Sequence, residues 1–481
     1  MKPVLLCLLA LLACLPQPTA AQPNLLVILT DDMGYGDLEI TGTQYLKTPN
    51  LTRLAEEGIF CSQAYVPSSV CSPSRAGIMT GRDPRRFGYQ ANLNKGSASY
   101  QTRPELLGLA PGEHTLADHL GAAEYETALI GKWHLGTGEG FHPLDRGFDY
   151  FCGMLGGSHG YFPTPERNSL ERNREEIPEF SSPYLTDFFT DEGLRWIEKQ
   201  EAEDRPWFAF LSYNAPHTPM QATEEDLAVF SQIENPKRRT YAAMMYNLDR
   251  NVGRILDALE EKEIREETLI VFFSDNGGAT SNSAWNGPLS GAKGTLREGG
   301  IRIPMIWSWP GALPEDSELK APVSALDVLP TFLAAANAEP LPLAPALPHE
   351  DKRNQERSVK TYGAYDGTNL LLALSGQEKE IEALRNRVLH WRLQGQTAIL
   401  SGDRKLIRLA HRPAQLFAPG SDLGEGSDLA ASEPEKLAEL FQQMAQWEAF
   451  LPTVPLWGSS PFWRGESAKH YDKIAPGPEP K

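Results

Sequence analysis

The amino-acid sequence predicts an α/β fold, in which a large sheet carries helices on both faces and a smaller α+β domain follows. Short apolar, β-rich runs alternate with helical patterns over the greater part of the chain. The 481 residues are enough for more than one domain, and contents of 41% hydrophobic and 22% charged residues are typical of a globular protein. We therefore expect a large buried core.

The chain begins with a segment typical of an export signal. An apolar stretch at residues 4–15 is too short to span a bilayer, and Thr19-Ala20-Ala21 is a small-residue cleavage site. This predicts a signal peptide at residues 1–21 and a secreted or periplasmic protein without a membrane span. One alternative stays open, because Leu11-Leu12-Ala13-Cys14 loosely resembles a bacterial lipobox, which would make Cys14 a lipid anchor.

Four apolar runs each end in polar residues that could bind or react. The runs at residues 25–30, 127–130, 207–213 and 269–273 lead into Asp31-Asp32, Gly131-Lys132-Trp133-His134, Asn214-Ala215-Pro216-His217 and Ser274-Asp275-Asn276. Helical patterns occupy residues 50–57, 115–122, 186–200 and 241–261. In α/β sheets ligands bind beyond the carboxyl ends of the strands. We therefore expect the four polar clusters to converge in one crevice.

The pattern of predicted secondary structure changes towards the C-terminus. A Pro-rich and charged stretch at residues 339–356 predicts a surface excursion. Short strands are expected at residues 397–400 and 405–409, and an amphipathic helix at 434–450 has Leu437, Leu440 and Met444 on one side. We predict a large domain of residues 22–385 and a C-terminal α+β domain, an antiparallel sheet plus a helix, of residues 386–481.

Cysteine count and charge limit the classes of protein. Removal of the signal leaves Cys61, Cys71 and Cys152, an odd set that keeps at least one thiol out of an intramolecular disulfide. The net charge of −18 argues against non-specific nucleic-acid binding. It does not exclude an anionic substrate, because a local basic pocket dominates at short range in salt.

The segment Cys71-Ser72-Pro73-Ser74-Arg75 is the most informative of the chain. Ser72 as N-cap and Pro73 in the first turn predict that a helix begins here. Arg75, four residues after Cys71, would place its guanidinium beside the sulfur. Both features would favour an anion at residue 71. The pentapeptide alone leaves a free or disulfide-bonded structural cysteine equally open, because environment separates reactive from structural thiols.

Two strand ends offer oxygen donors for a metal ion. Asp31-Asp32 and Asp275-Asn276 are hard ligands without clustered Cys or His, which favours Ca²⁺, or Mg²⁺, over Zn²⁺. Each pair alone also fits a helix cap or a turn. Lys132 and His134 would share one face if their segment stays extended. A solvated lysine and a packed histidine are the plain alternative for that pair.

Residues 67–82, which contain this pentapeptide, resemble the signature of the type I sulfatases, the formylglycine-dependent family. Residues 26–37 and 272–278 look like the two metal-binding segments of that family, and residues 131–136 look like its second signature. His217 and Lys293, the latter in Gly291-Ala292-Lys293-Gly294-Thr295, also match family positions. The matches occur in family order and cover nearly the whole mature chain, with the weakest likeness at residues 339–360 and at the C-terminus.

This resemblance implies a fold, an activity and a modified residue. The fold would be alkaline-phosphatase-like, a large mixed sheet flanked by helices, and the activity that of a sulfuric ester hydrolase. A maturation enzyme would oxidise Cys71 to Cα-formylglycine. The hydrate of that aldehyde would be the nucleophile and would form a covalent sulfo-enzyme intermediate. A neighbouring calcium ion would have residue 71 and four further ligands, namely Asp31, Asp32, Asp275 and Asn276.

The resemblance also implies roles for the charged residues. Arg75 would favour ionisation of one hydroxyl of the hydrate. Lys132, His217 and Lys293 would hold the sulfate group, and His217 with Lys293 would protonate the leaving oxygen. His134 would take the proton of the second hydroxyl and so release sulfate.

The resemblance also suggests a substrate class, and two alternative functions stay open. Residues 156–162 are similar to bacterial N-acetylgalactosamine-6-sulfatase-like or arylsulfatase-like enzymes, which favours a sulfated carbohydrate, either a glycosaminoglycan or an algal galactan such as carrageenan. One alternative is a phosphomonoesterase or phosphodiesterase of the same superfamily, although those typically use Ser or Thr with two Zn²⁺. The other is a non-catalytic protein that binds sulfated glycans, if Cys71 is not matured.

Overall fold

The computed structural model describes residues 22–93, 107–163, 170–203, 205–342, 365–451, 469–471 and 479–480. The predicted signal peptide with Cys14 and most of the predicted excursion at 339–356 lie outside these ranges. Among the helices in these ranges, none combines the length and the apolar character that crossing a membrane requires.

A mixed sheet of eleven strands organises the larger part of the molecule. The strands are β1 Asn24–Thr30, β2 Ile59–Tyr65, β3 Glu126–Lys132, β4 Tyr150–Met154, β5 Leu170–Arg172, β6 Glu175–Ile177, β7 Trp207–Ser212, β8 Thr268–Ser274, β9 Arg302–Ser308, β10 Ser317–Leu319 and β11 Val323–Ser324. Their order is β10-β2-β9-β8-β1-β7-β3-β4-β5-β6, and β11 also pairs with β2. Strands β8, β1, β7, β3 and β4 are parallel, whereas β9 runs antiparallel to both β8 and β2.

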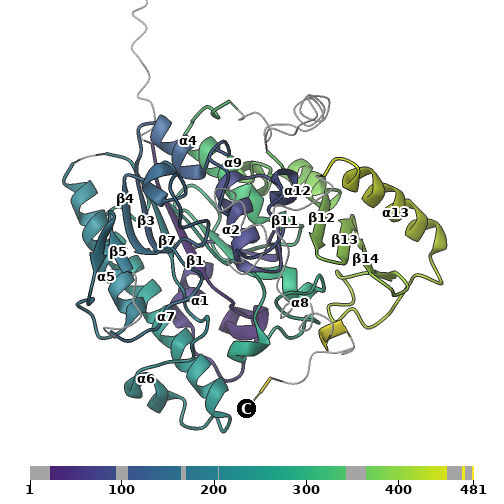
Figure 1. The fold of residues 1–481 in the computed structure, drawn as a ribbon, viewed down its shortest axis with the longest axis horizontal. Coiled ribbons are helices and arrows are strands. Elements are labelled where there is room, and N and C mark those ends of the chain that lie inside the picture. Colours follow the sequence, from purple (N-terminus) through teal and green to yellow (C-terminus); the bar gives the residue numbers. More distant parts are fainter. Residues whose placement is uncertain are drawn as a thin grey trace, which may run out of the picture.

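Helices cover both faces of this sheet (Figure 1). One face carries α1 Pro49–Glu56, α5 Leu185–Glu201 and α7 Pro236–Glu261, and the other carries α2 Cys71–Thr80, α4 Leu116–Ala122 and α9 Val328–Ala335. Alternate residues of β1 serve the two layers, since Leu26 packs in the first and Leu25 in the second. The predicted α/β fold with helices on both faces is confirmed.

The remaining elements are short. The α-helices are α6 Glu224–Val229, α8 Glu298–Ile301, α11 Leu371–Leu374 and α12 Glu378–Arg385. Single turns of 3-10 helix lie at Tyr35–Asp37, Glu39–Thr41, Pro84–Phe87, Pro143–Asp145, Thr280–Asn282 and Ala325–Asp327.

Helix α7 begins earlier than the sequence pattern predicted. The prediction began at Tyr241, but the helix begins at Pro236. The Oδ1 atom of Asn235 accepts hydrogen bonds from the backbone N–H groups of Lys237 (3.0 Å) and Arg238 (3.1 Å). An Asn cap followed by Pro in the first turn is a helix-start signal that an apolar periodicity does not contain. Helices α1, α4 and α5 agree with the prediction to within one residue at each end.

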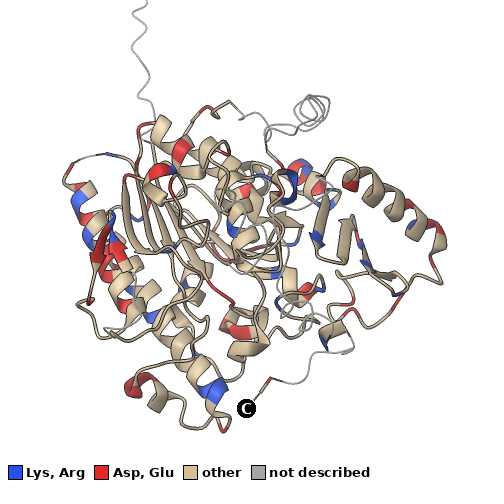
Figure 2. Ribbon diagram, viewed as in Figure 1, with Lys and Arg blue, Asp and Glu red and all other residues tan. Residues whose placement is uncertain are grey.

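Charged residues are distributed unevenly over the sheet, as Figure 2 shows. The central strands β1, β7 and β8 contain no Asp, Glu, Lys or Arg, because helices bury both of their faces. The edge strand β6 is acidic, with Glu175 and Glu176, and its neighbour β5 carries Glu171 and Arg172. Like charges along an edge strand oppose edge-to-edge pairing with another sheet.

The C-terminal part contains a separate antiparallel sheet, β12 Val388–Leu393, β13 Gln396–Ser401, β14 Arg404–Leu409 and β15 Gln415–Phe417. Helix α13 Pro434–Glu448 packs against it at one end of the molecule (Figure 1). Leu440 and Met444 are fully buried in this contact, and Leu437 is partly buried. The predicted antiparallel sheet with an amphipathic helix is confirmed, whereas the exact domain boundary at residue 386 stays a prediction.

A buried ionic network joins the small sheet to the large one. On β14, the Lys405 Nζ atom lies 2.7 Å from Glu298 Oε1 and 2.9 Å from Glu425 Oε1, and all three side chains are inaccessible to solvent. The other oxygen of Glu425 accepts hydrogen bonds from Ser290 Oγ (2.8 Å) and from the backbone N–H of Glu298 (2.9 Å). A buried charge without its partner costs far more than the pair gains. The network therefore fixes how the two sheets meet.

Replacing Lys405 should destabilise the protein strongly. The variant Lys405→Met leaves two buried carboxylates facing each other, and we expect it to lower the free energy of unfolding by about 3–5 kcal/mol. The measurement is urea unfolding followed by fluorescence. The control is Lys436→Met on α13, whose pair with Glu439 (3.0 Å) is exposed and should be worth less than about 1 kcal/mol. Equal unfolding midpoints for both variants would contradict the structural role of the network.

Candidate active site

The four polar clusters meet at the carboxyl edge of the large sheet, as the sequence predicted. The backbone N–H of Asp31 donates to the carbonyl of Ala215 (3.0 Å), and that of Asp275 donates to the carbonyl of Thr30 (3.0 Å). The Lys132 Nζ atom, at the end of β3, lies 2.6 Å from Asp31 Oδ2. The parallel strands β1, β3, β7 and β8 thus bring their following residues together.

Cys71 is the first residue of α2 and is only 1% exposed. Its Sγ atom lies 2.9 Å from the Nζ of Lys293 and 3.9 Å from Asp32 Oδ1. Burial raises the pKa of the thiol, and the two nearby lysines, Lys132 and Lys293, offset this only in part. The three cysteines of the described chain, Cys61, Cys71 and Cys152, form no disulfide with one another.

The prediction that Ser72 caps this helix is wrong. Val70 is the N-cap residue, and its side chain makes no capping hydrogen bond. The Ser72 hydroxyl instead donates to the carbonyl of His134 (2.7 Å) and lies 2.5 Å from the hydroxyl of Tyr89. The serine therefore connects α2 to the segment after β3. Pro73 does lie in the first turn, as predicted.

Arg75 is buried and connects three elements at the site. Its Nε lies 2.8 Å from Asp275 Oδ2, and its Nη1 donates to the carbonyl of Lys132 (2.9 Å) and to Ser212 Oγ (2.6 Å). Burial, followed by the negative charge of Asp31, raises the pKa of Asp275 to about 7, although Arg75 opposes this shift. Sequence reasoning did not single out Ser212, although a serine that ends a fully apolar strand is a usable signal.

Two lysines pair with the adjacent carboxylates of Asp31 and Asp32. Lys132 contacts Asp31, as stated above, and the Lys293 Nζ atom lies 2.5 Å from Asp32 Oδ1. Burial would raise the pKa of Asp31, but the positive charges of Lys132 and its neighbours outweigh burial and lower it. For Lys293, burial acts to lower the pKa, and the surrounding acidic groups raise it further than burial lowers it. The charged forms of Asp31 and Lys293 are therefore favoured.

The oxygen donors at this point fit a hard metal ion. Asp31, Asp32, Cys71 and His217 each place a ligand atom within 4.8 Å of those of the others. Asp31 Oδ1 and Asn276 Oδ1 are buried and have no hydrogen-bond partner among the described residues. A cation would satisfy such oxygens, which otherwise cost free energy. Asp275, the other predicted ligand, is held by Arg75, and its Oδ1 accepts from the backbone N–H of Asp32 (3.4 Å).

His217, which the resemblance assigns to the sulfate group, lies close to the donors of the possible metal site. Its Nε2 atom is 3.6 Å from Asp32 Oδ2, and its Nδ1 atom donates to the carbonyl of Thr218 (2.7 Å). Burial lowers the pKa of His217, and the charges of Asp31 and Asp32 oppose that shift in part. The arrangement leaves Nε2 as the atom that faces the carboxylates.

A family model described as Sulfatase matches residues 23–338 of the chain. The chain belongs to the sulfatase family. The N-acetylgalactosamine-6-sulfatase of Canis lupus familiaris is 35% identical over 341 residues, which are 68% of this chain and 63% of that protein. Human arylsulfatase A is 31% identical over 523 residues, which are 98% of this chain and 96% of that protein.

Solved structures agree with this assignment. The crystal structure of Ps i-CgsB in complex with k-i-k-neocarrahexaose superposes with a TM-score of 0.80 at 33% identity, over 94% of this chain and 99% of the other. The predicted family and fold are therefore confirmed. The aligned part spans less than two thirds of the canine protein's own length.

His134 departs from the extended conformation expected for its segment. Strand β3 ends at Lys132, and His134 has a left-handed backbone with φ of 61°. Its Nδ1 atom has no hydrogen-bond partner among the described residues. Burial, followed by the positive charges of Lys132 and Arg75, holds the pKa of His134 well below its usual range. The imidazole is therefore neutral.

Gly157 is required beside this imidazole. A Cβ atom at residue 157 would lie 2.6 Å from His134 Nε2, closer than side chains approach each other. No sequence pattern predicts this contact, because the two residues follow different strands, β3 and β4. Gly156, the preceding residue, has open space at the corresponding position.

The pair of glycines provides a matched test of His134. Gly157→Ala should push the imidazole aside and lower turnover of a sulfate ester by about tenfold to a hundredfold, because misplacement by about 1 Å has effects of that size. Gly156→Ala adds the same methyl group in open space and should keep turnover within about twofold of the unchanged protein. Steady-state kinetics and thermal unfolding of both variants provide the comparison. Equal activities of the two variants would show that the position of His134 does not matter.

Proposed function

We propose that this protein hydrolyses sulfate esters of a carbohydrate after Cys71 has been oxidised to Cα-formylglycine. The observation that carries the proposal is the setting of Cys71, whose Sγ lies among Lys293, Asp32 and the other donors at the start of α2. A buried thiol with a raised pKa is a poor nucleophile. The surroundings therefore suit a different chemical group at residue 71.

Formylglycine would supply that group. Its hydrated aldehyde offers a nucleophilic oxygen, and its carbonyl can form again when sulfate departs, which neither serine nor cysteine allows. Formation of formylglycine requires a maturation enzyme as a partner. The predicted export of the protein, to the periplasm or the cell exterior, remains part of this proposal.

The remaining residues have roles that follow from charge. A sulfate ester needs cations on its oxygens and a proton for the leaving oxygen. Lys132, Lys293 and His217 hold the sulfate group, and His217 with Lys293 protonates the leaving oxygen. Arg75 holds Asp275 and adds positive charge beside residue 71. His134, kept neutral by its surroundings, accepts the proton whose loss releases sulfate.

The metal would be Ca²⁺, or Mg²⁺, held by oxygen donors. The proposed ligands are residue 71 and the side chains of Asp31, Asp32, Asp275 and Asn276. The buried oxygens of Asp31 and Asn276 that have no hydrogen-bond partner among the described residues support the choice. A bound ion supplies positive charge that polarises a neighbouring oxygen.

The comparisons support a sulfated carbohydrate as the substrate. Ps i-CgsB was crystallised with k-i-k-neocarrahexaose, and the similar curated enzymes include N-acetylgalactosamine-6-sulfatases. We therefore propose an algal galactan such as carrageenan, or a glycosaminoglycan. The proposal requires formylglycine at residue 71, whereas neither the phosphoesterase nor the glycan-binding alternative requires it.

The modification can be tested directly. Active protein should contain an aldehyde at residue 71, visible in the mass of the peptide and by reaction with a hydrazide. Cys71→Ser should lower turnover on the order of 10³-fold or more, because the nucleophile is lost. Cys152→Ala is the control, a buried free cysteine on β4 that should leave both aldehyde and turnover in place. Full activity in protein that contains only the unmodified thiol would exclude the mechanism.

Metal removal tests the ligand set. Chelation should abolish turnover and added Ca²⁺ should restore it, and Asp31→Ala should weaken calcium binding because a small hard-ion site loses one carboxylate. Calorimetry of calcium binding measures this without substrate. Asp145→Ala, which removes an acid from an exposed pair with Arg174, should bind calcium normally. A stoichiometric pair of zinc ions found by elemental analysis would favour the phosphoesterase alternative instead.

A further inference from the structure

Lys293 is placed differently from the other residues of the site. Asp31, Lys132, His217 and Asp275 lie at or shortly after the ends of strands of the large sheet, and Cys71 begins α2, so regular structure positions them. Lys293 lies in the long segment between the end of β8 at Ser274 and the start of α8 at Glu298. Its ammonium must still reach both Cys71 Sγ and Asp32 Oδ1.

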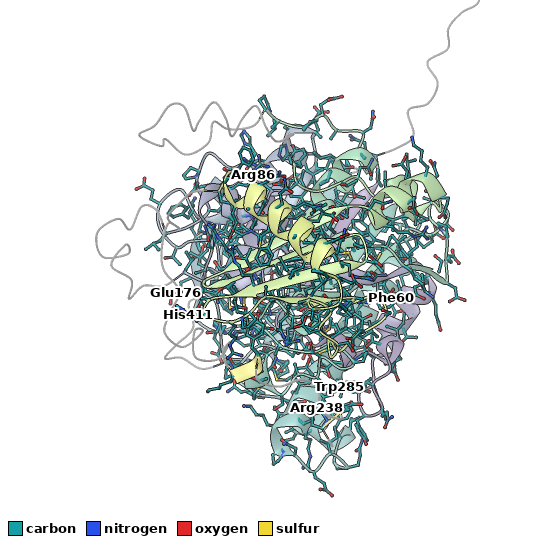
Figure 3. The ribbon with its side chains drawn as sticks, turned by 90° about the vertical axis from the view of Figure 1, so that its right-hand side faces the viewer. Phe60, Arg86, Glu176, Arg238, Trp285 and His411 are labelled. Carbon is teal, nitrogen blue, oxygen red and sulfur yellow. The ribbon has the colours of Figure 1, made fainter. Side chains whose placement is uncertain are left out.

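The first half of that segment is anchored within the large domain. The backbone N–H of Trp285 donates to Asp37 Oδ2 (2.9 Å), and Arg238 lies 2.7 Å from Asp37 Oδ1. Arg238 also donates to the carbonyl of Ser283 (3.1 Å). Trp285 and Arg238 are labelled together in Figure 3. The large domain also holds the segment at Lys293 itself, whose backbone N–H donates to the carbonyl of Gly278 (3.1 Å).

The C-terminal part of the chain adds further contacts to the second half of the segment. Gln396, the first residue of β13, donates from Nε2 to the carbonyl of Gly294 (2.9 Å). The hydroxyl of Tyr471 accepts from the backbone N–H of Leu296 (2.8 Å) and donates to Gln396 Oε1. These bonds bracket Thr295 and hold the backbone directly after Lys293.

The direction of each hydrogen bond in this bracket is determined. The single proton of the Tyr471 hydroxyl goes to Gln396 Oε1, because the backbone N–H of Leu296 already donates to that hydroxyl. The amide of Gln396 must then present its NH₂ group to Gly294. Gln396 and Tyr471 are 6% and 8% exposed, so water has little access to replace either contact.

Gly294, the residue after Lys293, is held by hydrogen bonds on both of its backbone polar groups. It has a left-handed backbone with φ of 85°, and its own N–H donates to the carbonyl of Ser69 (2.8 Å), two residues before Cys71. One residue, Gly294, thus connects the Cys71 segment, the backbone after Lys293 and β13. The ammonium of Lys293 reaches Asp32 Oδ1 and Cys71 Sγ from a long side chain, and a shift of its backbone would change the direction from which it reaches them.

We propose that Gln396 and Tyr471 are positioning residues for Lys293 and so control protonation of the leaving oxygen. The inference rests on the proposed sulfatase function. It assigns to the small C-terminal sheet a part in catalysis, exerted through the backbone of Gly294 and Leu296. Neither side chain is proposed to touch the substrate.

The test uses aryl sulfates whose phenols become increasingly basic. A poorer leaving group depends more on the proton, so a displaced Lys293 should matter most for the most basic phenol. Tyr471→Phe and Gln396→Met should lower kcat/KM about tenfold for the poorest leaving group, the effect of one lost hydrogen bond, and less than about twofold for the best. Lys293→Ala should show the same trend more strongly.

A double-mutant cycle separates positioning from general destabilisation. In the Lys293→Ala background, adding Tyr471→Phe should cost less than about a further twofold, because the group that the tyrosine positions is gone. The control is Leu440→Ala, which weakens the contact between α13 and the small sheet without touching residues 290–298. It should lower the thermal midpoint and leave the dependence on the phenol unchanged.

The outcomes distinguish this inference from the proposed function. Equal loss for all leaving groups in Tyr471→Phe, or full additivity with Lys293→Ala, would overturn the positioning role while wild-type turnover upheld the sulfatase function. No turnover of any sulfate ester by wild-type protein that carries the aldehyde would overturn both. A leaving-group dependence confined to the Lys293, Gln396 and Tyr471 variants supports the positioning role.

Discussion

Charge neutralisation in a dry site is the constraint on which the rest of this structure depends. Three carboxylates and three cations meet at the carboxyl edge of the sheet, nearly all without solvent contact. The pairs are Lys132–Asp31, Lys293–Asp32 and Arg75–Asp275. A buried charge that loses its partner costs several kcal/mol, roughly a third of the stability of a typical domain. The ends of β1, β3 and β8, the start of α2 and the segment of Lys293 are therefore held in fixed relative positions.

The same balance explains how a protein with a net charge of −18 can accept an anion. Within the site each of the three carboxylates faces a cation, so the proposed divalent ion would add positive charge beside residue 71. A sulfate monoester carries one negative charge. Because charges in salt act over about 8–10 Å, the acidic surface elsewhere has little influence at this distance scale. The neutral imidazole of His134 adds a proton acceptor without disturbing that balance.

The sequence predicted those parts of the site that follow from local rules. Apolar runs ending in Asp31, Lys132 and Asp275 predict parallel strands, and parallel strands bring their carboxyl ends together. The hydroxyl of Ser72 and the backbone of His134 could not be predicted, because each depends on the other: the serine bonds to the carbonyl of a residue far along the chain instead of capping its own helix. The apolar pattern likewise missed the start of α7, which a polar cap determines.

The hydrogen bonds from Gln396 and Tyr471 to Gly294 and Leu296 connect the family-matched region with the C-terminal part of the chain. Residues 23–338 contain every predicted site residue, yet Gln396 and Tyr471 lie beyond them. Gln396 and Tyr471 each supply one hydrogen bond to this backbone, and such a bond stabilises by about 0.5–1.5 kcal/mol. In the positioning proposed above, the C-terminal part of the chain supports the fold and the place of Lys293 through the same contacts.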